Sequence, residues 1–216
     1  MTRLWLRIFL LALAIASPPA ASAQTAATRY PAFAPRAFVM FSQQQFTAKD
    51  TFEAIFGEST GSFRGGGVDV VVARNIFVEV GFARFERIGE RVFRSGGETF
   101  KLGIPLTARI RPLELAAGYR LTLWRRVLPY GGVGIGSYRY EESSDFAATG
   151  DNVSVSASGP IVVAGAELRI ARFIGVTADV HYSRIEEVIG GGGISREFGE
   201  NDLGGTSARF RIIIGR

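Results

Sequence analysis

The stretch IVVAGAELRIARFIGVTADVHYSRI, residues 161–185, decides how the rest of the chain is interpreted. A membrane-spanning helix would bring Glu167, Arg169 and Asp179 into or near the hydrocarbon, at a cost of a few kcal/mol each. Two strands fit better, because apolar and polar residues alternate on either side of a break at residues 171–173. The apolar positions are Val162, Ala164, Ala166, Leu168 and Ile170, then Ile174, Val176, Ala178, Val180 and Tyr182. This spacing is typical of a hairpin in a transmembrane β-barrel.

The N-terminal segment has the features of a secretory signal peptide. Arg3 and Arg7 precede an apolar run over residues 8–16, and the small residues Ala21-Ser22-Ala23 offer a cleavage site. The alternative, an N-terminal membrane anchor, needs a longer apolar run than this one. The expected divisions are a signal peptide at residues 1–23, a short lead-in at 24–33 and a transmembrane β-barrel at 34–216.

The composition excludes several classes of protein. The chain contains no cysteine, so it can form no disulfide and has no thiol to carry a lipid anchor. Without Arg3 and Arg7 the formal net charge falls from +5 to +3, and the remaining basic residues are scattered along the chain. Because they form no Lys/Arg cluster, we expect no nucleic-acid partner. The mature chain has the length of one domain.

The mature chain repeats the pattern of residues 161–185. A first strand lies within residues 36–49, in the segment AFVMFSQQQFT, but its alternation does not decide which face is apolar. Further strands pair as hairpins across the turns 73–75 and 122–126. The predicted strand regions are 36–49, 63–72, 76–85, 106–121, 129–140, 161–170, 174–185 and 204–215.

One of these strands, residues 106–121, changes register in its middle. Ala108 and Ile110 share one face, whereas Leu113 and the alternate residues after it share the other. A β-bulge at Pro112 would reconcile the two halves.

The connections between the strands alternate in length. Short turns follow the second, fourth and sixth strands, and long polar connections, expected to be loops, follow the others. Outer-membrane barrels have this asymmetry, with short periplasmic turns and long extracellular loops. The long connections are residues 50–62, 86–105, 141–158 and 186–201. We therefore predict an all-β fold, an eight-stranded antiparallel up-and-down transmembrane β-barrel.

The segment Pro129-Tyr130-Gly131-Gly132-Val133-Gly134-Ile135-Gly136 combines a Pro-Tyr pair with a ladder of glycines. With the signal peptide and the closing strand, it resembles the small outer-membrane β-barrel domains of the OmpA, OmpX and OmpW type. The closing strand departs from that family in ending Ile214-Gly215-Arg216, where an aromatic residue is usual. The resemblance implies localisation in the cell outer membrane, contact with outer-membrane lipid, and handling by the barrel-insertion machinery during biogenesis.

Glycines indicate which face of the strands points inward. In the narrow interior of an eight-stranded barrel, small residues leave room for large charged ones. On a watery exterior, as in a lipocalin-like periplasmic barrel, glycine would only weaken a strand. The glycines that share faces with charged residues are Gly81, Gly118, Gly132, Gly134, Gly136, Gly165 and Gly175. The polar faces are therefore predicted to line the interior.

That predicted interior is nearly balanced in charge. It contains Asp69, Glu79, Glu114, Glu167 and Asp179, together with Arg120, Arg169, Arg209 and Arg211. An unpaired charge there would cost several kcal/mol, so we expect a packed network of salt bridges and hydrogen bonds.

Little metal or nucleophile chemistry is available. With one histidine and no cysteine, the chain can assemble neither a zinc cluster nor a Cys/His nucleophile. Acidic residues in the long loops could bind divalent cations only weakly, and a solvated loop is the simpler interpretation. They are Glu141, Glu142, Asp145, Asp151, Glu186, Glu187, Glu197, Glu200 and Asp202. We predict no cofactor and no metal site.

The motif His181-Tyr182-Ser183 is the one candidate for catalysis. It is similar to the His-x-Ser pair of the lipid A deacylases, eight-stranded outer-membrane enzymes in which serine attacks an acyl ester with histidine as base. The glutamates that could orient the histidine are Glu186, Glu187 and Glu197. However, His181 and Ser183 share the inward face with Asp179, whereas an enzyme acting on lipid must face the lipid. We expect His181 and Asp179 to form a structural hydrogen-bonded pair, and predict no enzymatic activity.

These observations favour a monomeric barrel whose interior is filled by its own side chains. Its function would then be structural, or would reside in interactions of the four long extracellular loops. The alternative implied by the OmpW resemblance is passage of small hydrophobic molecules across the outer membrane.

Overall fold

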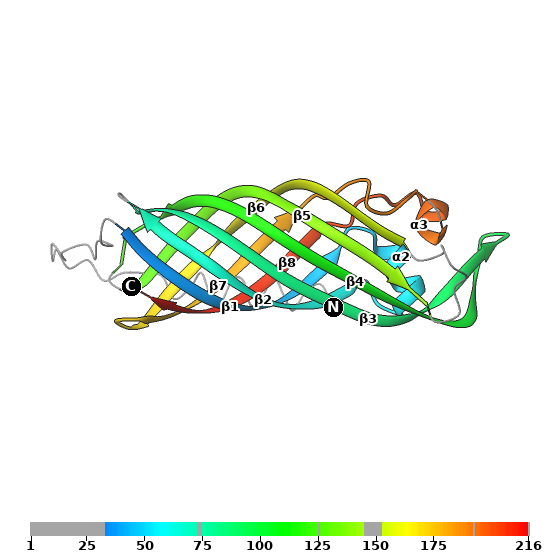
Figure 1. Ribbon diagram of the computed structural model, residues 1–216, viewed down its shortest axis with the longest axis horizontal. Helices are drawn as coiled ribbons and strands as arrows, with labels where there is room; N and C mark the ends of the chain where they lie inside the picture. Colours follow the sequence, from blue (N-terminus) through cyan, green and yellow to red (C-terminus); the bar gives the residue numbers. More distant parts are fainter. Residues whose placement is uncertain (1–32, 73–74, 125, 145–152, 192, 216) are drawn as a thin grey trace, which may run out of the picture.

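The computed structural model describes residues 33–72, 75–124, 126–144, 153–191 and 193–215. Eight antiparallel strands form a closed barrel in which each strand pairs with its neighbours in the chain and β1 closes against β8 (Figure 1). The strands are β1 (Phe33–Phe46), β2 (Thr60–Val72), β3 (Ile76–Ser95), β4 (Glu98–Arg120), β5 (Val127–Ser143), β6 (Val153–Ala171), β7 (Ile174–Ser183) and β8 (Gly205–Gly215). The predicted fold class is confirmed. The predicted signal peptide and most of the lead-in lie outside the described residues.

The two ends of the barrel differ. Short connections join β2 to β3, β4 to β5 and β6 to β7 at the end where the C-terminus lies (Figure 1). At the other end, helices α2 (Lys49–Phe56) and α3 (Gly193–Phe198) lie close to the barrel mouth, and the β3–β4 hairpin projects beyond it. From the length asymmetry of outer-membrane barrels, we refer to these as the periplasmic and extracellular ends. No helix in the described ranges is long and apolar enough to cross a bilayer.

Burial alternates along the strands as the sequence predicts. On β7, Thr177, Asp179 and His181 are buried, whereas Ile174 and Val180 are exposed. Large apolar side chains are exposed on every one of the strands. A protein surrounded by water rarely exposes so much contiguous apolar surface. The inward orientation of the charged faces is confirmed, and the lipocalin-like alternative was wrong.

Strand β1, whose faces the sequence left undecided, begins at Phe33 and has a mixed inner face. Arg36, Phe38 and Met40 point inward and are buried, while Val39 and Phe41 are more than half exposed on the outside. Its alternation is hard to interpret because both faces are largely apolar.

The predicted β-bulge at Pro112 was wrong. Strand β4 pairs with β5 in one register throughout residues 107–120. Ala108 and Ile110 are fully buried in the interior, whereas Leu113 is exposed on the outside. The apolar residues change face because the inner wall changes along the barrel, from apolar at the extracellular end to charged further down.

All four predicted loops contain regular structure. Helix α2 and the start of β2 occupy 50–62, extended β3 and β4 fill most of 86–105, β5 and β6 enter 141–158, and α3 lies within 186–201. Residues 145–152 lie outside the described residues. The extended strands were missed because segments that project into water can be polar on both faces, which removes the period-two signal.

Several of the inward positions occupied by glycine have no room for a Cβ, for two different reasons. A Cβ on Gly136 would lie 2.7 Å from the Tyr138 ring, so this glycine leaves room for a large inward side chain. At Gly134, however, a Cβ would lie 2.0 Å from the backbone oxygen of Leu115 on the neighbouring strand. Much of the glycine requirement therefore comes from close approach of the barrel's own backbone.

Replacing Gly134 with alanine is expected to lower the free energy of unfolding by about 1–3 kcal/mol, the usual cost of overpacking. Gly131, on the same strand, provides the matched control, because a Cβ there would lie 3.8 Å from its nearest neighbour, the Val163 oxygen. The Gly131→Ala change should alter stability by less than about 0.5 kcal/mol. Urea unfolding in phospholipid vesicles measures both, and equal effects would contradict the steric explanation.

Candidate functional site

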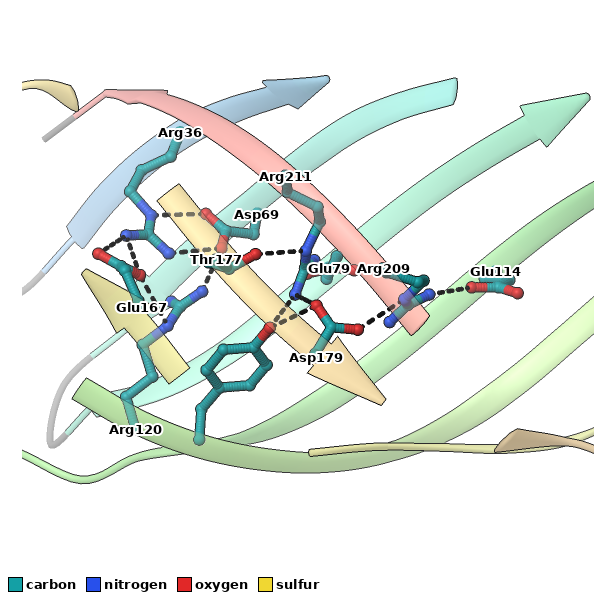
Figure 2. A network of polar contacts seen from close by, with 11 residues as sticks. Arg36, Asp69, Glu79, Glu114, Arg120, Glu167, Thr177, Asp179, Arg209 and Arg211 are labelled. Atoms are coloured by element: carbon teal, nitrogen blue, oxygen red, sulfur yellow. Dashed lines mark hydrogen bonds and ion pairs between the residues drawn. The ribbon is translucent and has the colours of Figure 1, made fainter. Parts of the chain in front are cut away.

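The interior near the periplasmic end is filled by a layer of paired charges (Figure 2). Arg36 donates to both oxygens of Asp69, at 2.8 and 2.6 Å, and to both oxygens of Glu167, at 2.9 and 2.8 Å. Arg120 also pairs with Asp69, and its Nε lies 3.5 Å from Glu167. The Arg120 guanidinium lies over the Phe77 ring, 4.6 Å from its centroid. Such fork-shaped contacts fix the side chains in one arrangement.

A second layer of charges lies next to it, toward the extracellular end. Arg211 donates to Glu79 at 2.5 Å and to the Tyr130 hydroxyl at 2.5 Å, and its Nη2 lies 3.1 Å from Asp179. The Tyr130 hydroxyl in turn donates to Asp179 at 2.7 Å. Arg209 then links Asp179, at 2.7 Å, to Glu114, at 3.1 Å (Figure 2). The two layers together close the interior with polar contacts.

The predicted interior network is confirmed in its members, with one addition. Arg169 is the most exposed of the predicted set, and its Nε lies 3.7 Å from Glu167. Arg36 was missed, although it lies directly across from Asp69 in the β1–β2 register. It was hidden because the next inward residues of β1, Phe38 and Met40, are apolar. With Arg36 included, five arginines face five carboxylates.

His181 and Ser183 both lie inside the barrel wall and are buried. The His181 Nδ1 lies 3.3 Å from the Ser207 hydroxyl, and its Nε2 lies 3.3 Å from a Glu114 oxygen. The predicted hydrogen-bonded pair of His181 with Asp179 was therefore wrong, because Asp179 is taken by Arg209, Arg211 and Tyr130 instead. The inward placement of His181 is confirmed.

The glutamates that could have oriented His181 lie elsewhere. Glu186 is exposed and pairs with Arg184 at 2.6 Å. Glu187 and Glu197 are exposed as well. Of the residues predicted for a deacylase site, only His181 and Ser183 on β7 lie together inside the barrel. The three glutamates are exposed.

The extracellular half of the interior is apolar. Phe46 is fully buried, stacks on Phe52 of α2 with a centroid distance of 3.8 Å, and packs edge-on against Phe85 at 5.7 Å. Phe63 and Ile110 are buried in the same cluster. Helix α2 is thereby inserted into the barrel mouth as a lid of aromatic side chains.

Loop contacts hold this lid in place. The Glu200 carboxylate accepts the backbone N–H groups of Asp50, at 3.1 Å, and Thr51, at 2.8 Å, at the start of α2. A carboxylate at this position satisfies N–H groups that the helix leaves unpaired. Glu58, after α2, pairs with Arg87 of β3, and this hydrogen bond holds the pKa of the Glu58 carboxyl below its usual value. Through the Glu200 contacts, the connection between β7 and β8 packs against the connection between β1 and β2.

A pocket of about 610 Å³ borders the buried cluster around Phe46, with which it shares Tyr140 and Ile189. Its wall is mainly apolar and includes Ile55 of α2, Phe93 of β3, Leu106 of β4, Tyr140 of β5 and Ile189. A cavity of this size and character is typical of sites for small apolar ligands.

The acidic residues of the connections do not gather into a metal site in the described ranges. No group of three or more His, Asp or Glu side chains there could hold an ion. Glu200 and Asp202 instead accept backbone N–H groups, Asp202 from Ile185 at 2.7 Å and from Gly204 at 2.8 Å. Asp145 and Asp151 lie outside the described residues.

Comparison with known proteins places the fold. The chain is similar to Neisserial surface protein A, with 12% identity over 86% of this chain and 96% of that one and a TM-score of 0.53. It is also similar to the N-terminal β-barrel domain of Pseudomonas aeruginosa OprF, with 9% identity, coverage of 84% and 97%, and a TM-score of 0.48. None of the curated proteins matches the chain.

The sequence matches the family described as outer membrane protein beta-barrel domain over residues 8–210, nearly its whole length. This match agrees with the closed ring of strands, the apolar outer wall and the charged interior. The chain therefore belongs to the outer-membrane protein β-barrel family and is a protein of the outer membrane.

Proposed function

We propose that this chain acts as a monomeric, non-conducting barrel whose role is structural or lies in surface interactions of its extracellular end. The proposal rests on one observation: side chains fill the interior in both its periplasmic and its extracellular part. Paired charges such as Arg36 with Glu167 fill the periplasmic part, and the cluster around Phe46 fills the extracellular part. Ions need a continuous watery path, and an eight-stranded barrel is just wide enough for side chains to fill.

Conductance across a planar bilayer tests the closure. The purified barrel is expected to give no stepwise current at potentials at which a general porin, added to the same bilayer as a positive control, conducts. Reproducible single-channel steps from the wild-type protein would overturn the proposal.

The projecting β3–β4 hairpin separates a structural role from a surface-interaction role. Because Val92 pairs with Lys101, replacing residues 93–100 by an Asn-Gly turn should shorten the hairpin without disturbing the barrel. If the hairpin mediates surface interactions, cells carrying the short form should lose attachment to other cells or coated surfaces while keeping envelope integrity. If a strain that lacks the whole protein keeps both attachment and envelope integrity, both roles are overturned.

A second candidate function, passage of small hydrophobic molecules, is supported by the apolar pocket. The filled interior below it offers no direct route, so a bound molecule would have to leave through the wall toward lipid. Binding of an apolar fluorophore, reduced at least about tenfold by Ile189→Glu but not by the exposed change Phe100→Ala, would support this function. Equal binding by all three proteins would exclude the pocket as the site.

The proposal assigns no chemistry to His181 and Ser183, because both are buried on the inner face and turned away from lipid. The purified protein is expected to release no acyl chains from lipid A. Acyl release that is lost in both His181→Ala and Ser183→Ala, with the barrel still folded, would overturn the non-enzymatic assignment.

A further inference from the structure

Four arginines form a row across adjacent strands on the outside of the barrel. Arg64 on β2 lies directly opposite Arg84 on β3, and Arg111 on β4 lies directly opposite Arg139 on β5. The β3–β4 register, which runs unchanged on either side of them, also sets Arg84 opposite Arg111. All four side chains are exposed on the outer face. We call them the arginine row.

The row is unfavourable for the barrel alone. Like charges directly opposite one another on neighbouring strands repel, and neighbouring strands are only about 4.8 Å apart. Glu86 pairs with Arg84 and with Arg109, and Glu141 pairs with Arg111 at 3.4 Å and Arg139 at 2.8 Å. Two glutamates thus pair with four arginines, counting Arg109. Among the described residues Arg64 forms no ion pair. The patch therefore keeps an excess of positive charge.

The row lies at the extracellular rim of the apolar band. Phe82 precedes Arg84 by one outward position on β3, and Leu113 follows Arg111 by one outward position on β4, and both are more than half exposed. From there to the periplasmic ends, the outward residues of the described strands carry no charge. A side chain at this rim lies at the level of the lipid headgroups of the outer leaflet.

The positive charge is confined to one side of the barrel. In strand register, the row is flanked by uncharged outward residues: Phe41 on β1 lies opposite Arg64, and Ser156 on β6 lies opposite Arg139. Beyond β7, the exposed Arg184 is balanced one-to-one by Glu186. A general preference for basic residues at the rim would not produce this asymmetry. A localised anionic partner would.

We propose that the arginine row is a binding site for lipid A, the phosphorylated glycolipid of the outer leaflet, and that it holds the lipid by its phosphate groups. Guanidinium groups bind phosphate through paired, charge-assisted hydrogen bonds. The apolar wall below the row, including Phe82 and Leu113, then contacts the acyl chains of the same molecule. This site is independent of the proposed surface role, because it lies on the lipid-facing wall.

The test compares the wild-type barrel, folded in uncharged detergent, with a variant that combines Arg64→Gln, Arg84→Gln, Arg111→Gln and Arg139→Gln. Native mass spectrometry measures retention of deep-rough lipopolysaccharide, which is expected to be weaker by about tenfold or more in the variant. The matched control removes four exposed basic residues elsewhere, at Lys101, Arg126, Arg172 and Arg196, and should retain the lipid as the wild type does.

The thermal unfolding temperature supplies a second readout. Which of the two proteins, wild type or row variant, unfolds at the higher temperature should depend on whether the lipid is present. In phosphate-free detergent the row variant should be at least as stable as the wild type, because repulsion has been removed. With lipopolysaccharide the wild type should become the more stable of the two. Dephosphorylated lipopolysaccharide, or inorganic phosphate alone, should give the wild type no such advantage.

Three results would overturn the proposal: equal lipid retention by the wild type and the row variant, equal loss in the row variant and the control, or full stabilisation by inorganic phosphate alone. If the fourfold variant fails to fold, Arg64→Gln takes its place, because it breaks no ion pair among the described residues. It is expected to weaken lipopolysaccharide retention about three- to fivefold. An unchanged retention in that variant would contradict the site as well.

Discussion

Replacing Arg211 with methionine is expected to lower the free energy of unfolding by about 3–5 kcal/mol, because it leaves buried carboxylates without their counter-charge. Arg211 bonds to Glu79 and to the Tyr130 hydroxyl and lies 3.1 Å from Asp179. Methionine keeps much of the side-chain volume and removes the charge. Urea unfolding in phospholipid vesicles, followed by the fluorescence of Trp124 at the periplasmic end, measures the loss.

Two controls separate the charge effect from packing. Arg184→Met removes an exposed arginine that pairs with Glu186, and should cost at most about 1 kcal/mol. Adding Glu79→Gln to the Arg211→Met variant removes the orphaned charge and should recover part of the stability. If both single arginine variants lose the same amount, or the second change recovers nothing, the network is not held by paired charge.

Phe46→Ala is the second large effect, with an expected loss of about 3–5 kcal/mol. The ring is fully buried, stacks on Phe52 at 3.8 Å and lies within 6.1 Å of Phe63, so its removal opens a cavity at the centre of the aromatic cluster. Because Phe52 belongs to α2, the lid should also loosen. Hydrogen exchange of the α2 amides should accelerate, in addition to the shift of the urea midpoint.

The matched control for this prediction is Phe100→Ala. Phe100 lies in the projecting hairpin opposite Phe93 and is about half exposed, so its loss should cost less than about 1 kcal/mol. Phe46→Leu, which refills most of the volume, should lie between Phe46→Ala and the wild type. An α2 exchange rate unchanged in Phe46→Ala would show that the helix is held by its loop contacts alone.

The sequence determined the strands that cross the membrane and the direction in which their faces point. Alternation in the segment around Asp179 is a local property of the chain, because side chains of a strand point to opposite sides in turn. The clustering of glycines such as Gly165 with charged residues then identified the inner face. Both features can be recognised without knowing which strands are neighbours. They are lost where strands project into water, which is why the extensions of β3 and β4 were taken for a loop.

Only the tertiary structure decided which groups meet. Arg36 binds Glu167 although the two residues are 131 positions apart, because closure of the barrel brings β1 and β6 to face each other across the interior. The packing of α2 against Phe46 and the pairing of Arg64 opposite Arg84 likewise depend on closure of the barrel and on strand register. These relations involve partners on different strands, and alternation within one strand carries no information about its partner.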